Sequence, residues 1–415
     1  MAYDKAIKTP IRSGGVGWQS IGKEELEIAT ELLTNPELLW RYRKDSYTTK
    51  FEQMACEMTG AKHALFVNSG TSALSCCLAS LGVGPGDEVI VSAYTYIATA
   101  SACIEVGAVP VPCEIDNSLG IDPVDLEKKI TPYTKCVILT HMQGVPACID
   151  QVRAVAKKHG LYMIEDCCQA IGAKYKGKFC GVDSDAFAWS LNYYKNITCG
   201  EGGCFFTNSD DNYARGYYQS DPAGIMWNNG IGEGSNVPYF TRAGYRASEL
   251  CGGVAYAQLH KLEGNLAVTR KLKKTLLAAL DPNPKHYTRQ IVGDEDGDCG
   301  VSFAMIANSA EECKALTEAL DREGLAVGSA YGNGAFPDRH IFTYWSGITN
   351  RTGATEKNYP WHDPAYKGDV DYEKTACPKT LDILSRSLRI GIHLNLTEQN
   401  MLEFAEAINK ADASF

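Results

Sequence analysis

Short apolar runs alternate with segments of helical period between about residues 60 and 210. The runs are rich in β-branched and aromatic residues, and they predict strands at 64–68, 88–92, 109–115, 136–141, 162–166, 186–191 and 203–207. The intervening segments predict helices at 71–81, 98–106, 122–129 and 149–159. Because strands that are apolar along their whole length are buried on both faces, the pattern predicts an α/β domain with a mostly parallel seven-stranded sheet covered by helices.

The pattern changes after about residue 246. Two successive helices are predicted at 246–262 and 266–280, followed by strands at 301–307, 326–331 and 388–393 and helices at 310–323 and 397–409. We therefore expect a large domain over 1–262, including an N-terminal arm, and a smaller α+β domain over 263–415. A long loop at 333–377 is rich in tryptophan and tyrosine, which is typical of packing over a pocket, on the surface or against a second subunit.

Composition narrows the classes of function. The 415 residues are 45% hydrophobic and 22% charged, as in a globular protein, and the net charge of −10 argues against a nucleic-acid partner. No stretch approaches the ~18 consecutive apolar residues of a membrane span, so we expect no membrane partner and a cytoplasmic location. The 16 cysteines lie mainly in apolar runs without metal-binding spacing, which favours buried thiols over disulfides or a metal site.

Two polar motifs follow predicted strands in the first half of the chain. The segment Asn68–Leu74 places a glycine and hydroxyl residues where a helix begins, an arrangement that can bind phosphate or simply cap the helix. Tyr96 follows the strand at 88–92, where an aromatic ring can stack on a flat ligand or pack between strand and helix.

Two ionisable residues follow later strands. Asp166 ends the strand at 162–166, and a carboxylate buried there needs a positive partner, such as a protonated pyridine nitrogen, unless it caps a turn. Lys195 follows the strand at 186–191 and precedes a glycine-rich turn, so it is either a nucleophilic amine with a lowered pKa or a surface lysine. A possible phosphate-binding turn, an aromatic ring, an aspartate and a lysine thus follow predicted strands in this order. Together they are a more specific indication of a ligand site than any one of them.

These motifs resemble the DegT/DnrJ/EryC1/StrS family of sugar aminotransferases, which are fold-type I pyridoxal-phosphate enzymes. The resemblance covers nearly the whole chain and is carried by the segments 68–74, 82–89, 165–172, 175–178, 190–203 and 248–250. It implies that Lys195 is the Schiff-base lysine, that Asp166 partners the pyridine nitrogen and that Gln169 approaches the phenolic oxygen. It further implies that Tyr96 stacks on the cofactor and that Gly70, Thr71, Ser72 and Ser190 hold the phosphate.

The family resemblance also sets expectations for reaction and partners. An amino group from glutamate or glutamine would pass through the cofactor, pyridoxal 5'-phosphate, to a keto-sugar in a ping-pong cycle. A nucleotide-linked keto-sugar, an aminocyclitol precursor and an acidic sugar of the amino-octulosonate type are all plausible acceptors. A homodimer with active sites at its interface is implied as well. The alternatives are a sugar dehydratase, in which the family has histidine at the lysine position, and a non-catalytic regulator that binds the cofactor.

Two segments depart from the family pattern. The family often has asparagine, reaching the partner subunit's phosphate, where this chain has Gly244, so Arg242 or Asn236 would have to replace that contact. The segment Leu39–Arg43 lacks the glycine that is common there, which indicates a subgroup with its own substrate.

Overall fold

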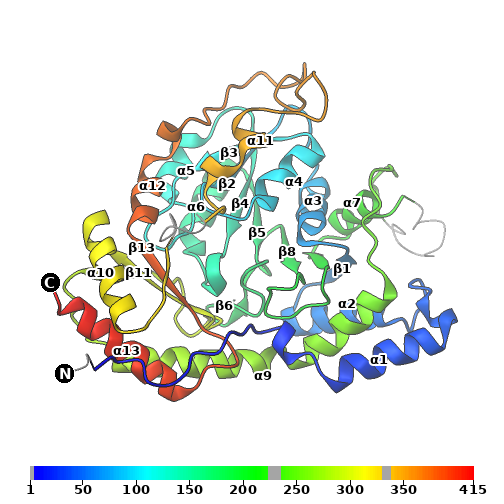
Figure 1. The fold of residues 1–415 in the computed structure, drawn as a ribbon. Helices are drawn as coiled ribbons and strands as arrows, with labels where there is room; N and C mark the ends of the chain where they lie inside the picture. The colour runs from blue at the N-terminus through cyan, green and yellow to red at the C-terminus, as the bar shows by residue number, and fades with distance from the viewer. Residues whose placement is uncertain (1–3, 223–234, 330–337) are drawn as a thin grey trace.

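The computed structural model describes residues 4–222, 235–329 and 338–415, and its centre is a seven-stranded sheet (Figure 1). The spatial order is β1-β9-β8-β5-β4-β2-β3. The strands are β1 (His63–Val67), β2 (Glu88–Ser92), β3 (Val109–Cys113), β4 (Thr134–Thr140), β5 (Tyr162–Asp166), β8 (Ala186–Ser190) and β9 (Gly203–Thr207). Every residue of β2, β3, β8 and β9 is buried, so both faces of the sheet are covered. The predicted fold class is confirmed.

Six strands of this sheet run in one direction, and β9 is antiparallel to both of its neighbours, β1 and β8. The covering helices are α3 (Gly70–Ser80), α4 (Ala98–Val106), α5 (Pro123–Lys129), α6 (Ile149–His159) and α7 (Asp210–Ser220). Helix α3 packs between α4 and α7, while α5 and α6 form a second pair against β3, β4 and β5. The parallel strands bring their carboxyl ends to one edge, which is where the polar motifs lie.

A four-stranded antiparallel sheet forms the smaller unit, in the order β10-β11-β13-β12. Its strands are β10 (Tyr287–Arg289), β11 (Ser302–Ala307), β12 (Gly328–Ser329) and β13 (Ser387–Gly391). Helices α10 (Ala310–Arg322), α12 (Pro378–Ser385) and α13 (Glu398–Asp412) accompany it. The short strand β10 was not predicted, and part of the predicted strand at 326–331 falls outside the described residues.

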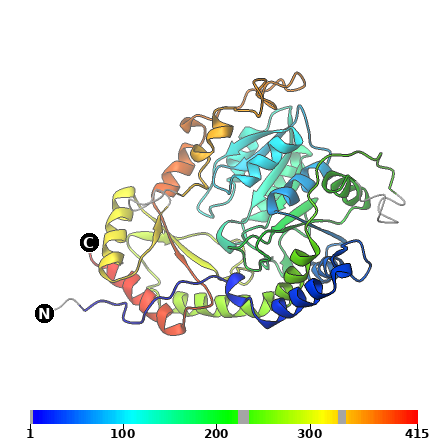
Figure 2. The same ribbon diagram turned by 45° about the vertical axis from the view of Figure 1, so that its right-hand side comes forward.

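Helix α9 (Glu249–Ala279) is continuous over 31 residues, so the prediction of two separate helices is wrong. Its first half carries Leu259 and Leu262 into the large core, and its second half carries Leu272 and Leu276 into a second core with the small sheet. The helix runs beneath both units, as both views show (Figures 1 and 2). The division at 262/263 stays a prediction, and it falls inside this helix.

The remaining elements lie at the N-terminus and in the connections. They are η1 (Trp18–Ser20), α1 (Lys23–Thr34), η2 (Pro36–Leu39), α2 (Tyr47–Thr59), η3 (Met142–Gly144), β6 (Lys174–Tyr175) and β7 (Lys178–Phe179). Ala6 lies in the second core, so the N-terminal arm packs against the small unit as well as the large one. No helix within the described ranges has both the length and the apolar character needed to cross a bilayer.

The described part of the predicted loop, from residue 338 onward, is ordered by short elements and buried aromatic rings. It contains η4 (Phe342–Tyr344), α11 (Ser346–Thr349) and η5 (Lys374–Ala376). Trp361 Nε1 donates a hydrogen bond to Tyr372 Oη at 2.9 Å, and Tyr372 Oη donates to Pro110 O at 2.7 Å. The segment therefore packs beside β2 and β3, and residues 338–340 reach the carboxyl edge of the sheet. Residues 333–337 lie outside the described part of the chain.

Candidate active site

A cavity of about 880 Å³ opens at the carboxyl edge of the large sheet. Seven of the eight residues predicted for the site line it: Gly70, Thr71, Tyr96, Asp166, Gln169, Ser190 and Lys195. The eighth, Ser72, is buried beside the cavity and does not line it. Segments far apart in the sequence thus meet because the parallel strands β1, β2, β5 and β8 end at one edge.

Helix α3 points its N-terminus at the cavity. Ser69 is the N-cap, and its hydroxyl accepts a hydrogen bond from the Ser72 amide at 3.1 Å. The Ser72 hydroxyl donates to Asn68 Oδ1 at 2.7 Å, so this side chain serves the cap. The amides of Gly70 and Thr71 belong to the first turn, which has no acceptor within the helix and attracts an anion through the helix dipole.

Gly70 is required by the close approach of β8 to this helix. A Cβ atom at Gly70 would lie 2.7 Å from Ser190 Cβ and 3.1 Å from Cys168 Sγ. Because Gly70 has no Cβ atom, the Ser190 hydroxyl can lie beside the helix N-terminus, 3.0 Å from the position that such an atom would take. The Ser190 hydroxyl therefore lies beside the first turn of α3, and hydroxyl and amide donors together suit a phosphate group.

Asp166 lies buried at the end of β5, with only 4% of its surface exposed. Its carboxylate accepts a hydrogen bond from Thr99 Oγ1 at 2.8 Å and one from the Cys168 amide at 3.1 Å. Among the described residues, no lysine, arginine or histidine lies within ion-pair distance of it. A buried carboxylate held only by neutral donors leaves its charge uncompensated, so a cationic ring nitrogen fits this position.

Lys195 lies in the loop after β8, half-buried at the cavity wall. The loop is fixed by its backbone: Lys195 N–H donates to Asn192 O at 3.0 Å, and Gly17 N–H donates to Lys195 O at 3.1 Å. The preceding residues Tyr193 and Tyr194 are 46% and 82% exposed. The lysine is thus held by its backbone and by the N-terminal arm.

The other two predicted residues, Gln169 and Tyr96, also line the cavity. Gln169 Oε1 accepts a hydrogen bond from the Gln143 amide at 3.2 Å. Tyr96 is 55% exposed, and its ring lies 5.8 Å from the His340 ring, centroid to centroid, with a tilt of 54°. The ring of Tyr96 is therefore free to lie against a flat ligand in the cavity.

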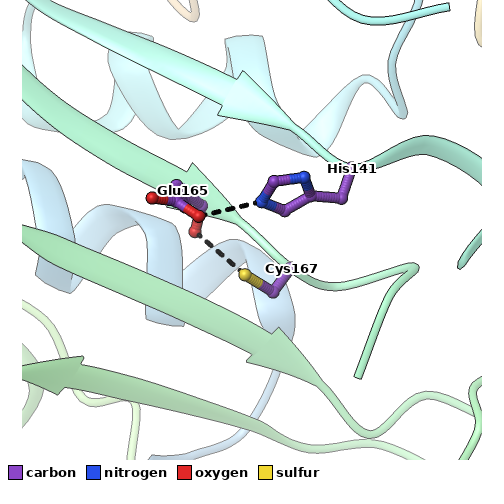
Figure 3. Close-up of side chains that lie close together, drawn as sticks. All are labelled: His141, Glu165 and Cys167. Carbon is purple, nitrogen blue, oxygen red and sulfur yellow. Dashed lines mark hydrogen bonds and ion pairs between the residues drawn. The ribbon is translucent and has the colours of Figure 1, made fainter. Parts of the chain in front are cut away.

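Buried His141, Glu165 and Cys167 lie close together, as Figure 3 shows, and Glu165 and Cys167 are the sequence neighbours of Asp166. Because His141 Nδ1 accepts the Ala147 amide at 3.0 Å, its Nε2 carries the proton and donates to Glu165 Oε2 at 3.0 Å. Glu165 Oε2 also accepts the Gly181 amide at 2.7 Å. Burial raises the pKa of the Cys167 thiol well above its usual value, which keeps it protonated. Each possible ligand atom is thus engaged in a hydrogen bond or protonated, so the cluster braces the end of β5.

Several lining residues were not predicted from the sequence: Gly14, Gln143, His340, Arg389 and His393. Gln143 comes shortly after the end of β4, just as Asp166 stands at the end of β5. Because ligands bind beyond the carboxyl ends of parallel strands, the argument that identified Asp166 also applies to Gln143. Arg389 is a charged residue in the middle of an apolar strand, which is a second signal in the sequence.

The segment around Gly244 lies next to the phosphate turn of the same chain, since the Asn68 amide donates to Tyr245 O at 2.8 Å. A Cβ atom at Gly244 would meet no atom of the described residues within 4 Å, so close packing against them does not require a glycine there. Arg242 Nη2 donates to Val106 O at 3.3 Å. The contact with a partner subunit stays a prediction.

The fold is that of pyridoxal-phosphate-dependent sugar aminotransferases. The chain belongs to the DegT/DnrJ/EryC1/StrS aminotransferase family, whose model matches residues 19–344. The family and the cofactor predicted from the sequence are confirmed.

The relatives are similar over part or all of the chain. Spore coat polysaccharide biosynthesis protein SpsC of Bacillus subtilis (strain 168) is 43% identical over 46% of this chain, and the match spans about half of that relative, 48%. GDP-perosamine synthase of Escherichia coli O157:H7 is 34% identical over 61% of this chain and 67% of its own length. The crystal structure of 3-amino-5-hydroxybenzoic acid synthase is 27% identical, with a TM-score of 0.74 over 96% of this chain and 98% of that chain.

Proposed function

We propose that the protein transfers an amino group from glutamate or glutamine to a keto-sugar, with Lys195 as the residue that holds pyridoxal phosphate. The observation that carries the proposal is the joint placement of Lys195 and the uncompensated, buried Asp166 in one cavity with the N-terminus of α3. Relatives named GDP-perosamine synthase support a nucleotide-linked sugar as the acceptor class.

Each proposed residue has a distinct task. The amides of Gly70 and Thr71 and the hydroxyl of Ser190 bind the phosphate, and Ser72 keeps the cap in place. Tyr96 stacks on the ring, and Gln169 approaches its phenolic oxygen. When bound, the cofactor supplies an electron sink for the α-carbon of the amino donor.

Proton movement falls to two residues. Asp166 keeps the ring nitrogen protonated, because its own charge has no other partner among the described residues. The amine of Lys195 would take the proton from the donor's α-carbon and deliver it to the former aldehyde carbon of the cofactor, on the other side of the donor's nitrogen. The same two steps in reverse order aminate the keto-sugar, which accounts for a ping-pong cycle.

A dehydratase is the second candidate on this fold. The structure titled GDP-4-keto-6-deoxymannose-3-dehydratase has a TM-score of 0.74 but only 18% identity, a similarity that concerns the fold alone. The family resemblance associates dehydratases with histidine at the lysine position, and this chain has Lys195 there. A regulator that binds the cofactor without turnover is the third candidate.

The test is the absorbance spectrum of the protein reconstituted with pyridoxal phosphate. We expect a band of the lysine-held cofactor that disappears on addition of glutamate or glutamine and is replaced by that of the aminated cofactor. Lys195→Ala should lack the first band and all turnover, whereas Lys157→Ala, on the exposed face of α6, should retain both. A normal band in Lys195→Ala would overturn the assignment, and a band that no amino donor changes would favour the regulator.

We also propose that the protein is a homodimer. Exposed apolar side chains on and near α1 support a second copy as a partner, namely Ile21, Leu26, Leu33 and Trp40 at 50%, 67%, 61% and 50% exposure. Light scattering coupled to gel filtration should give twice the monomer mass, and a monomer at micromolar concentration would contradict the proposal.

A further inference from the structure

A second cavity, of about 320 Å³, adjoins the candidate active site. The two cavities share five lining residues: Tyr96, Gln143, Gly328, His340 and Arg389. Because the first cavity contains the residues proposed to hold the cofactor, the second offers room for a reactant that extends away from it.

Arg389 brings an unpaired positive charge to the junction of the two cavities. It occupies the centre of β13, between Leu388 and Ile390, which are buried. Strand alternation turns its side chain to the opposite face, and it is exposed into both cavities. Within the described ranges, its guanidinium has no hydrogen bond and no carboxylate at ion-pair distance. A guanidinium stays charged and offers five N–H donors suited to an oxyanion.

The nearest acid in the second cavity is already engaged. Asp338 accepts a hydrogen bond from His340 Nδ1 and another from Tyr94 Oη at 2.7 Å. Burial alone raises the pKa of Asp338, but the hydrogen bonds from His340 and Tyr94 outweigh it and hold the pKa at about 2. The carboxylate of Asp338 is thus engaged by its own hydrogen-bond donors, and the positive charge of Arg389 is left for a ligand.

Gln143 supplies an independent sign of a ligand. The residue is 8% exposed, and its Nε2 donates to Tyr94 Oη at 3.1 Å, but its Oε1 is buried and has no donor among the described residues. Its backbone has a φ of 61°, an uncommon conformation for a residue with a side chain, and is held there by the Ser302 hydroxyl, which donates to Gln143 O at 2.7 Å. A strained residue with an unmet acceptor at a cavity wall is typical of a binding site.

We propose that Arg389 and Gln143 form a subsite for an anionic, hydroxylated reactant. Arg389 binds a carboxylate or phosphate of the reactant, and Gln143 Oε1 accepts a hydrogen bond from a neighbouring hydroxyl or N–H group. The subsite deepens the proposed aminotransferase function and rests on it. The anion has two possible sources, the carboxylate of the amino donor and an acidic group on the sugar.

Binding of small anions to the enzyme loaded with pyridoxamine phosphate tests the subsite directly, without turnover. Calorimetric titration with D-glucuronate represents an acidic sugar, glutarate represents the donor, and neutral D-glucuronamide is the matched control. Arg389→Met should weaken binding of at least one anion by about 10- to 100-fold and leave glucuronamide unchanged. Arg389→Lys should retain part of the affinity, and Arg322→Met, at the exposed end of α10, all of it.

The outcomes separate the two sources. A loss confined to glutarate assigns the subsite to the donor, and a loss confined to glucuronate assigns it to the sugar. If neither anion binds the parent enzyme better than glucuronamide, or if Arg389→Met binds both as the parent does, the anion subsite is refuted.

Gln143→Met tests the hydroxyl contact. It should weaken glucuronate and glucuronamide alike, because both carry the sugar hydroxyls, and unchanged affinities would refute this part. The band of the lysine-held cofactor should be intact in every Arg389 variant. If the anion subsite is refuted while that band is present, the proposed function is unaffected. The proposed function is tested separately, by the spectrum of Lys195→Ala.

Discussion

Replacing Asp166 by asparagine removes a charge at the end of β5 while changing little of the packing. An asparagine oxygen can still accept the Cys168 amide, and its NH₂ group can donate to the Thr99 hydroxyl, so both hydrogen bonds have a replacement. We therefore expect the free energy of unfolding to change by less than about 1 kcal/mol. The variant isolates the electrostatic role of the carboxylate.

The magnitude of that role follows from the burial of Asp166. A unit charge about 4 Å from a cationic ring nitrogen contributes about 4 kcal/mol at an effective dielectric constant of about 20. The 4% exposure of Asp166 and the absence of another cation near it among the described residues leave little screening. If that contribution is lost in the transition state of proton transfer, the rate falls about a thousandfold.

Stopped-flow absorbance with glutamate as the donor measures this step in a single turnover. We expect Asp166→Asn to retain the cofactor and to convert it about a thousandfold more slowly, with a larger isotope effect when the α-hydrogen of glutamate is deuterium. Asp321→Asn, on the exposed face of α10, is the matched control and should react at the parent rate. A rate for Asp166→Asn within about threefold of the parent would show that the carboxylate does not act on the ring.

Two further predictions concern the phosphate turn and a reactive thiol. Gly70→Ala should lower the free energy of unfolding by about 1–3 kcal/mol and weaken cofactor binding, because its Cβ atom would lie 2.7 Å from that of Ser190. Gly264→Ala, in open space on α9, is the control and should be neutral or stabilising. Equal melting temperatures for the two variants would contradict the steric argument. A hydrogen bond from Cys199 lowers the pKa of Cys251 to about 6, so iodoacetamide should label Cys251 before the other cysteines. The labelling rate should rise between pH 5 and 7 as the thiolate forms, and Cys199→Ala should move this rise to higher pH. Peptide mapping by mass spectrometry identifies the labelled cysteine, and another cysteine labelled first would refute the prediction.

The large sheet was predictable because its strands are short, apolar and separated by helices. The predicted and observed bounds of β2, β5 and β9 coincide, and those of the other four strands differ by one or two residues at an end. The antiparallel direction of β9 was not predictable, because a strand buried on both faces has the same apolar pattern in either direction. The continuity of α9 was missed for a related reason: Gly264 breaks the apolar period, although nothing in the fold interrupts the helix there.

The part of the candidate site that lies at the carboxyl ends of the parallel strands was predictable from the sequence. Residues that follow parallel strands meet at one edge, which placed Asp166, Lys195, Tyr96 and the α3 turn in a single cavity. Arg389 comes from the small sheet, and the position of that sheet over the cavity depends on α9 and on β12 and β13, whose pairing has no local signature. The sequence therefore identified the side of the site that would hold the cofactor.

The residues on the cofactor side of the cavity and those on the side of the small sheet are held in place differently. This difference affects how easily the specificity for the acceptor can change. Asp166, Ser190 and the α3 turn are anchored by strands of the large sheet, where moving one would disturb a buried core. Arg389 and His340 stand on elements that meet the large unit at its edge, so their side chains can change with less cost to the fold. A family that keeps one cofactor and varies its sugars needs this division, since the cofactor geometry must stay constant while the acceptor pocket is altered. If the division holds here, substitutions at Arg389 should change which acceptor is used, and substitutions at Asp166 should slow the reaction of every acceptor alike.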